Sequence, residues 1–378
     1  MFRQGQFRRG HPRPHPKPGP PNCLGARDLV NQQRRPQNIV GLEIRLLHPK
    51  VPILKIPLVS KSAARASLPR IFAQTSAALS TTSGQIGVLH QYAPRPLSVP
   101  QPGRRQQITT LRFTIVTPSY NQGHFIGRTM DSVLSQNHPQ LEYVVQDGGS
   151  TDSTSEVIRD YAARLDRYES AKDNGQTHAI NLGFRGSSGD IMAYLNSDDL
   201  LLPGSLAYVE EYFQSHPDVD AIYGDRIIID EDDHEIGRWV LPAHDAEALR
   251  LADYIPQETL FWRRRVWDKI SCLDETFRFA MDWDLLLRLQ DAGANIVHLP
   301  RFLGAFRVHL SQKTSTELES RGAEEMDRLR RRSLGVDLTA SEIHIGLAKY
   351  RAAARRSARL WRLKRIFGLS NEIPYERR

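Results

Sequence analysis

The first pattern typical of secondary structure is Leu111-Arg-Phe-Thr-Ile-Val-Thr117, a short β-branched run that predicts a buried strand ended by Pro118. On its C-terminal side, apolar residues recur at helical spacing and then in further short β-branched runs. The expected strands are 111–117, 141–145, 191–195 and 221–223, and the expected helices are 126–134 and 157–165, the second capped by Asp152. Strands that alternate with helices in this way predict an α/β fold, with a mostly parallel sheet and helices on both faces.

In such sheets, ligands bind at the carboxyl ends of the strands, and polar clusters follow three of the expected strands there. Thr117-Pro-Ser-Tyr-Asn121 offers Tyr120, which either stacks on a base or simply packs. Asp147-Gly-Gly-Ser-Thr-Asp152 combines an acceptor for a base or ribose with two glycines that allow close backbone approach. A tight turn followed by a helix cap would explain the segment 147–152 equally well. Asn196-Ser-Asp-Asp199 either holds a hard divalent cation that bridges to phosphates or forms an Asx turn before a helix.

Two residues outside these clusters are also candidates. Asp282 precedes the strongly apolar helix Leu285–Leu289, so it is either a general base held at a cleft or a cap of that helix. His309 ends a strand-like run, 302–308, and is either a metal ligand or a structural histidine.

Charge is distributed very unevenly along the 378 residues, whose net charge is +8. Residues 108–310 carry 18 Lys/Arg against 32 Asp/Glu, whereas both flanks are basic. An acidic middle would repel a nucleic-acid backbone, so no nucleic-acid partner is expected, and its carboxylates favour a metal or a metal-bound substrate. Two cysteines exclude a disulfide framework and fit a reducing, cytoplasmic compartment.

Composition also divides the chain into three parts. Residues 1–107 hold 15 of the 23 prolines and show no sustained apolar period, which predicts a disordered or poorly structured basic extension. A catalytic domain is expected over 108–310 and a basic helical tail over 311–378. No apolar run is long enough for a transmembrane helix. The tail has an apolar side, so it is either a solvated helix or a peripheral contact with an anionic membrane.

Taken together, the motifs resemble family 2 glycosyltransferases, the inverting enzymes of the GT-A fold. The resemblance covers about 200 residues, from Leu111 to His309. No single motif is specific, but their order and spacing are. The matching segments are 117–121, 146–152, 173–176, 181–183, 189–190, 196–199, 274–277, 281–284 and 307–309.

The resemblance implies a role for each candidate. The donor nucleotide would be held by Pro118, Tyr120, Asn121, Asp147, Asp173, Gly175, Asn196 and Ser197. Asp198 and His309 would ligate a divalent metal, Mn or Mg, and Asp282 would be the catalytic base. The chain departs from the family pattern twice: Asn196 stands at the first position of the Asp-x-Asp motif, and Met281 stands where an acid is more usual.

The function implied is transfer of a sugar from a nucleotide-diphosphate donor, with inversion, to a hydroxyl of a glycan or lipid-linked acceptor. Surface polysaccharide or glycolipid synthesis, in the cytoplasm or at the inner face of the membrane, would use this activity. A nucleotide- or membrane-surface-binding protein without transferase activity is the alternative from another class. A nucleotidyltransferase would need a basic residue in a Gly-rich loop after the first strand, and 117–123 has none.

Overall fold

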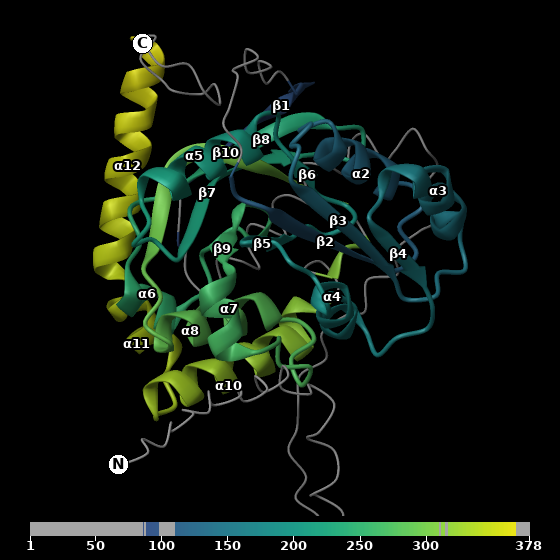
Figure 1. Cartoon of the computed structure of the whole chain (residues 1–378). Helices are drawn as coiled ribbons and strands as arrows, with labels where there is room; N and C mark the ends of the chain where they lie inside the picture. The colour runs from purple at the N-terminus through teal and green to yellow at the C-terminus, as the bar shows by residue number, and fades with distance from the viewer. Residues whose placement is uncertain (1–85, 87, 98–109, 310, 314–316, 368–378) are drawn as a thin grey trace, which may run out of the picture. The chain divides into compact units, whose positions relative to one another are not determined.

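The computed structural model describes residues 86, 88–97, 110–309, 311–313 and 317–367, and a ten-stranded mixed sheet organises them (Figure 1). The strands are β1 (Val88–Pro96), β2 (Phe113–Ser119), β3 (Leu141–Asp147), β4 (Arg167–Ser170), β5 (Ile191–Tyr194), β6 (Leu200–Leu201), β7 (Ala221–Ile229), β8 (His234–Val240), β9 (Phe261–Arg263) and β10 (Ile296–Arg307). The helices are α2 (Ile126–Leu134), α3 (Thr154–Asp160), α4 (Gln176–Phe184), α5 (Ser205–Ser215), α6 (Ala246–Leu251), α7 (Arg264–Ile270), α8 (Met281–Asp291), α10 (Ala323–Leu334), α11 (Ala340–Gly346) and α12 (Ala348–Ile366).

The strand order is β1-β8-β7-β9-β5-β2-β3-β4, and β10 pairs with β7 and β6. Parallel pairing joins β5, β2, β3 and β4, and also joins β7 to β10. The other ladders are antiparallel. The expected α/β class is therefore confirmed, and the parallel arrangement is found in the part of the sheet where the motifs lie.

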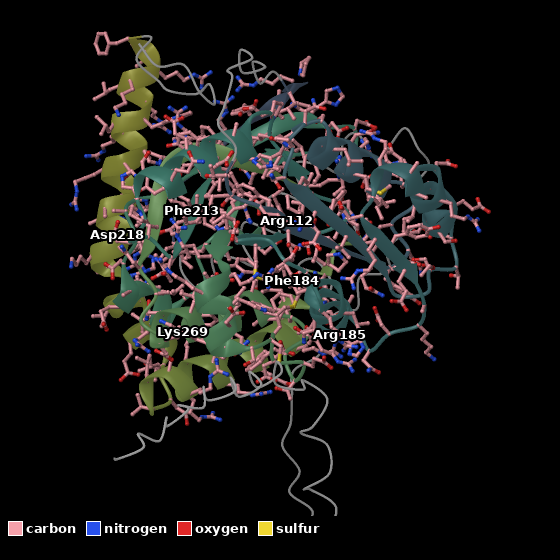
Figure 2. All side chains as sticks on the ribbon, in the orientation of Figure 1. Arg112, Phe184, Arg185, Phe213, Asp218 and Lys269 are labelled. Atoms are coloured by element: carbon pink, nitrogen blue, oxygen red, sulfur yellow. The ribbon has the colours of Figure 1, made fainter. Side chains whose placement is uncertain are left out.

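Two apolar layers cover the sheet, as alternation along β2 requires. Phe113 and Ile115 pack with α2, α3 and α5, whereas Val116 faces a layer that includes α4, α6, α7 and α8. Figure 1 shows these helices on the two sides of the strands. Phe213 of α5 and Phe184 of α4, one from each layer, are labelled in Figure 2.

Pro118 does not end the first strand, contrary to the expectation. The strand continues to Ser119, and Pro118 is buried opposite Gln146 of β3. The Val116 carbonyl accepts from Leu195 N on the β5 side, and residue 118 faces the same side. Because β5 ends at Tyr194 and does not reach residue 118, a backbone N–H there would have no partner in β5. Proline, which has no N–H, therefore costs no ladder hydrogen bond at this position.

The cap expected for α3 is displaced by one residue. Ser153 occupies the N-cap position, and Asp152 accepts a hydrogen bond from the first helical residue, Thr154, at 3.0 Å. The helix ends at Asp160, so Leu165 lies beyond it.

The boundary expected at 107/108 is wrong for Val88–Pro96, because these residues form an edge strand that pairs with β8. Its two prolines hid it from the apolar pattern, and prolines are tolerated at a sheet edge. The rest of the predicted extension lies outside the described residues, apart from Ile86 and Leu97.

The C-terminal segment is helical over 318–334, 340–346 and 348–366, as expected, but these helices are not separate from the domain before them. Leu329 of α10, Leu347 between α11 and α12, and Tyr350 of α12 are buried in the same cluster as Trp283 of α8. Among the described helices, none is both long and apolar enough to cross a membrane.

Candidate active site at the carboxyl ends of the parallel strands

The ends of β2, β3 and β5 bring the predicted donor-binding residues to one edge of the sheet. Asp147 is the last residue of β3 and is fully buried. Its carboxylate accepts from Ser150 N at 3.1 Å, from Ser150 Oγ at 2.5 Å and from Ser170 Oγ at 2.5 Å. A carboxylate has about four acceptor positions, so capacity for one further donor remains.

Asp173 lies beside this strand end because residue 148 is a glycine. A Cβ at Gly148 would stand 3.1 Å from both carboxylate oxygens of Asp173. Asp173 accepts from Gly175 N at 2.7 Å, and burial raises the pKa of Asp173 above its ordinary value. Gly175 has φ +106°, a conformation that favours glycine, with open space where a Cβ would point. The two positions therefore form one surface with Asp147.

The loop after β2 contributes one exposed ring and one structural amide. Tyr120 is 61% exposed, so its ring is accessible for stacking. Asn121 instead joins the two loops, because Thr151 N donates to its side-chain oxygen at 2.9 Å and its own N donates to Ser150 Oγ at 2.7 Å. Its φ of +53° is one that asparagine tolerates. The backbone shape of this edge therefore depends on Asn121.

Asn196 links the end of β5 to the start of α4. Its side-chain oxygen accepts from Gln176 Nε2 at 2.7 Å. Ser197 is buried, and its carbonyl accepts from Thr129 Oγ1 at 2.9 Å, which fastens the loop to α2. Lys313, far along the chain, donates to Gln176 Oε1 at 2.8 Å. A polar chain thus runs from Lys313 through Gln176 to Asn196.

Asp198 and His309 meet although 111 residues separate them: His309 Nε2 lies 3.0 Å from Asp198 Oδ2. The other ring nitrogen of His309 contacts Ser311 Oγ at 2.9 Å, which orients the ring. His309 is buried, whereas the Asp198 side chain keeps 19% of its surface exposed. The pair therefore offers one partly exposed carboxylate beside a buried imidazole.

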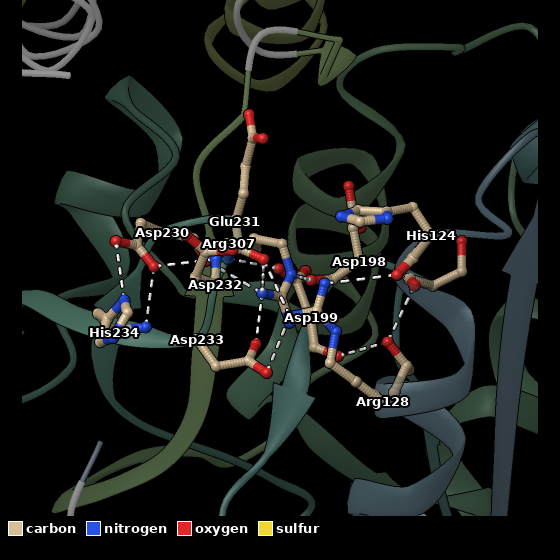
Figure 3. A network of polar contacts seen from close by, with 12 residues as sticks. His124, Arg128, Asp198, Asp199, Asp230, Glu231, Asp232, Asp233, His234 and Arg307 are labelled. Carbon is tan, nitrogen blue, oxygen red and sulfur yellow. Dashed lines mark hydrogen bonds and ion pairs between the residues drawn. The ribbon is translucent and has the colours of Figure 1, made fainter. Parts of the chain in front are cut away.

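Asp199 is buried and belongs to the polar network around Arg307 that Figure 3 shows. Its Oδ1 accepts from Arg307 N at 3.0 Å. Burial, and then the neighbouring charge of Asp198, raise the pKa of Asp199 well above its ordinary value. The Arg307 guanidinium is also buried and donates to the Asp198 carbonyl at 2.7 Å while pairing with Asp233. Arg307 thus braces the loop that presents Asp198.

The Asp198–His309 pair fits a divalent cation. Two adjacent ligands of an octahedral Mg²⁺ lie about 3 Å apart, because each bond is about 2.1 Å long. Among the described residues, no group of three or more Asp, Glu, His or Cys side chains is arranged to hold a metal. A cation here would therefore take its remaining ligands from water and substrate phosphates, as Mg²⁺ commonly does.

A pocket of about 290 Å³ opens beside this pair. Two of the predicted site residues, Asn121 and His309, line it together. The other lining residues are Gln122, His124, Phe125, Asp152, Glu231 and Ser311. The pocket is mixed in character, with a hydrophobic ring at Phe125 and polar groups around it.

Asp282 lies in the first turn of α8, not before the helix as expected. Burial raises its pKa above the ordinary value, while hydrogen bonding to Trp283 N and the charges of Lys313 and Arg226 act in the opposite direction. A second acid, Asp253, lies near enough for the charge of Asp282 to add to the effect of burial, and the pKa of Asp253 is raised well above its usual range. A carboxyl with a raised pKa is a suitable general base near neutral pH.

The segment before Asp282 is fastened by Glu325 of α10. Its carboxylate accepts from Arg278 N at 3.0 and 3.1 Å, from Phe279 N at 2.8 Å and from Ala280 N at 2.9 Å. Lys313 adds a bond to the Arg278 carbonyl at 2.5 Å. The first turn of α8 is thus held by residues from the C-terminal segment.

Several of these residues were missed in the sequence. Arg307 lies in the matching segment 307–309, but the motif gave it no role. Lys313 is four residues beyond His309, and this closeness in sequence was the one available sign that it belongs to the site. Glu325 and the buried Arg226–Glu258 pair, with contacts of 2.8 and 2.6 Å, carry no local signal. Their partners are 32 or more residues away.

Residues 114–270 match the family model described as Glycosyl transferase family 2. This part of the chain therefore belongs to glycosyl transferase family 2, as the motifs predicted, and forms a glycosyltransferase domain. Asp282, His309 and Glu325 lie beyond the matched segment.

Three proteins show how far the similarity extends. The O-antigen biosynthesis protein RfbC of Myxococcus xanthus is 30% identical over 215 residues, 56% of this chain but only 16% of that protein. The uncharacterized glycosyltransferase alr2836 of a Nostoc species is 26% identical over 290 residues, 70% of this chain and 88% of that protein. A PGL/p-HBAD biosynthesis glycosyltransferase of Mycobacterium bovis is 29% identical over 180 residues, 47% of this chain and 68% of that protein.

The solved structure of residues 1–349 of TarS from S. aureus, in complex with UDP-GlcNAc, superimposes with a TM-score of 0.50. It is 18% identical, and the alignment covers 69% of this chain and 74% of that one. This likeness supports the GT-A type of fold.

Proposed function

We propose that this chain is an inverting, metal-assisted glycosyltransferase. It moves a sugar from a nucleotide-diphosphate donor to a hydroxyl of a glycan or lipid-linked acceptor. The observation that carries the proposal is the meeting of Asp198 and His309 at the end of β5, on the same sheet edge as Asp147 and Asp173.

The donor nucleotide is assigned to the β2–β3–α4 edge. Tyr120 supplies an exposed ring for stacking, and Asp147 has capacity for one further hydrogen bond. Pro118, Asn121, Asp173 and Gly175 shape the same surface. Asn196 and Ser197 then lie between this edge and Asp198, where the diphosphate and sugar would follow.

Asp198 and His309 would hold the divalent metal, Mn or Mg, and the 3.0 Å between their ligand atoms is compatible with two positions of one coordination shell. When bound, such a cation neutralises negative charge that develops on a departing diphosphate. Ser311 would keep the histidine ring oriented.

Asp282 is proposed as the general base. One of its oxygens takes the proton of the acceptor hydroxyl, whose oxygen forms the new bond to the anomeric carbon. The bond from that carbon to the diphosphate oxygen breaks, and the nucleoside diphosphate leaves with the electron pair. A single displacement inverts the configuration, and no covalent enzyme intermediate is involved.

The acceptor class is inferred from the relatives, which are named for O-antigen and for PGL/p-HBAD biosynthesis. Surface polysaccharide or glycolipid synthesis is therefore the proposed context, on the cytoplasmic side of the membrane. Binding of a nucleotide without transfer is the alternative function that an experiment must separate from catalysis.

A screen of several nucleotide sugars tests the proposal. We expect release of nucleoside diphosphate from at least one donor, dependent on added manganese or magnesium. The Asp268→Asn variant, which changes an exposed carboxylate on α7, serves as the matched control and keeps this activity. Tight nucleotide binding without turnover of any donor would favour a binding protein.

A further inference from the structure

The last two turns of α12 and the residue that follows them place four large apolar side chains in solvent. Leu360 and Leu363 are 54% and 52% exposed, and Ile366 and Phe367 are 75% and 70% exposed. The other large exposed apolar residues, among those that the structure describes, are scattered singly: Tyr120, Tyr168, Val336 and Ile345. Exposed apolar residues are ordinary when single, but a cluster of four needs an explanation.

The orientation of α12 is fixed by its opposite face. Ala354 and Ala358 are buried. Trp361 stacks on His90 of β1 at 4.9 Å and contacts Phe302 of β10 at 6.4 Å. At 3.6 residues per turn, Leu360, Leu363 and Phe367 lie on the side of the helix turned away from these contacts. The helix runs along one edge of the molecule in Figure 1.

The same outward side is strongly basic. Helix α12 carries eight Lys or Arg side chains and no acidic residue. Arg355, Arg356, Arg359 and Lys364 are exposed around the apolar cluster. We call the set Arg356, Arg359, Leu360, Leu363, Ile366 and Phe367 the basic apolar face.

We propose that the basic apolar face docks on the surface of an anionic lipid bilayer. A helix with this combination lies in the interface plane, with its apolar residues among the acyl chains near the headgroups and its basic residues against anionic headgroups. The short apolar length is suited to lying on a membrane, not to spanning one.

Charge argues against the competing occupants. In a symmetric dimer, two copies of this face would bring like charges together with no acidic partner on α12. A nucleic-acid backbone would satisfy the arginines but would leave the four apolar side chains against phosphates and water. An anionic bilayer satisfies both sets of side chains. The proposal is independent of the proposed sugar transfer.

Vesicle co-sedimentation of the full chain tests the proposal. The probes are vesicles of phosphatidylcholine alone and of phosphatidylcholine with phosphatidylglycerol. We expect binding to the anionic vesicles only, and weaker binding at higher salt because screening shortens the range of the attraction. The basic N-terminal residues can also bind such vesicles, so the informative quantity is the difference between variants and the unchanged chain.

Two double variants separate the contributions. Arg356→Gln with Arg359→Gln should weaken binding about 25-fold, because each basic residue near an anionic surface is worth about fivefold. Leu363→Gln with Ile366→Gln should weaken it about tenfold or more while keeping helix propensity.

Matched controls change the same residue types elsewhere. Arg159→Gln with Lys172→Gln alters two exposed basic residues, and Val336→Gln with Ile345→Gln alters two exposed apolar ones. Both should bind vesicles as the unchanged chain does. All four variants should keep its melting temperature, since the altered side chains are exposed.

Two results would overturn the proposal. One is unchanged vesicle binding in both α12 variants. The other is a concentration-dependent dimer in sedimentation velocity that Leu363→Gln with Ile366→Gln dissociates, together with no vesicle binding, which would assign this face to a second copy of the chain.

Discussion

Asp198 and Asp199 are neighbours in the chain with different surroundings, which allows them to be separated by mutation. The Asp198 side chain is accessible and contacts His309, whereas Asp199 is buried and accepts from Arg307 N. One is therefore suited to a ligand and the other to holding the loop.

Asp198→Ala should abolish manganese-dependent binding of a nucleoside diphosphate and lower the free energy of unfolding by about 1 kcal/mol, because it also removes the hydrogen bond to His309. Asp199→Ala should instead lower the free energy of unfolding by about 1–3 kcal/mol, because the buried Arg307 N–H loses its acceptor. Calorimetric titration and thermal unfolding of both variants check this. Full metal-dependent affinity in Asp198→Ala would remove that residue from the metal site.

Asp282 acts as a base only when its proton is gone, so its raised pKa sets the acid limb of the activity profile. Turnover should fall as pH drops through that pKa, which burial raises above the ordinary aspartate value. The nearby charge of Lys313 lowers the pKa of Asp282, so Lys313→Gln should move the limb to higher pH. Turnover measured against pH in the unchanged chain and in Lys313→Gln tests this shift. An acid limb at the same pH in both proteins would show that Lys313 does not affect the pKa of Asp282.

The same raised pKa has a consequence for stability. A carboxyl that binds its proton more tightly when folded contributes stability below its unfolded pKa and loses it as pH rises through the folded pKa. Asp282→Asn should therefore be as stable as the unchanged chain or more stable at neutral pH, with turnover reduced about 100-fold or more. Near-normal turnover would mean that Asp282 serves only as an acidic residue in the first turn of α8.

The contact between α10 and the start of α8 positions the helix that carries Asp282. Glu325 accepts from the backbone N–H groups of Arg278, Phe279 and Ala280, and Arg332 of α10 donates to Asp284 at 2.5 Å. The helix that carries the proposed base is therefore positioned by a segment outside the family-model match.

Glu325→Ala should leave these N–H groups without an acceptor and lower the free energy of unfolding by about 1–3 kcal/mol. Turnover should fall while nucleotide affinity stays constant, because the nucleotide edge is on other elements. Glu325→Gln keeps an acceptor oxygen and should restore part of the turnover. Glu324→Ala, at the exposed neighbouring residue, is the control. A loss of nucleotide affinity equal to the loss of turnover would show general unfolding instead of a positioning role.

At the scale of the whole molecule, β1 closes one edge of the sheet. It pairs with β8, its residues Tyr92 and Arg95 contact the buried Glu235, and His90 stacks on Trp361. An uncovered strand edge is prone to pair with other chains.

A chain shortened to begin at Gln106 lacks β1 and should melt at a lower temperature and associate more readily than one that begins at Ile86. Thermal unfolding and size-exclusion chromatography of the two shortened chains provide the comparison. Equal melting temperatures and equal elution would show that β1 adds little to the fold.

Local sequence patterns determined the elements that carry the motifs. The β-branched runs at 111–117 and 141–145 and the helical spacing at 126–134 are short-range signals, since alternation and the 3.6-residue period are set by neighbouring residues. The order of the motifs was also sufficient to identify the family. These signals depend on backbone geometry within one element, so they can be recognised without knowing the fold.

Only the tertiary structure decided which distant residues meet. The Asp198–His309 contact spans 111 residues, Glu325 reaches the start of α8 from α10, and β1 joins the sheet across 143 residues to Glu235. No local period encodes such contacts, because they follow from how the two apolar layers pack on the sheet and bring separate loops together. The same packing buried Asp199 and left Asp198 partly exposed, a difference that two adjacent, identical residues cannot reveal in sequence.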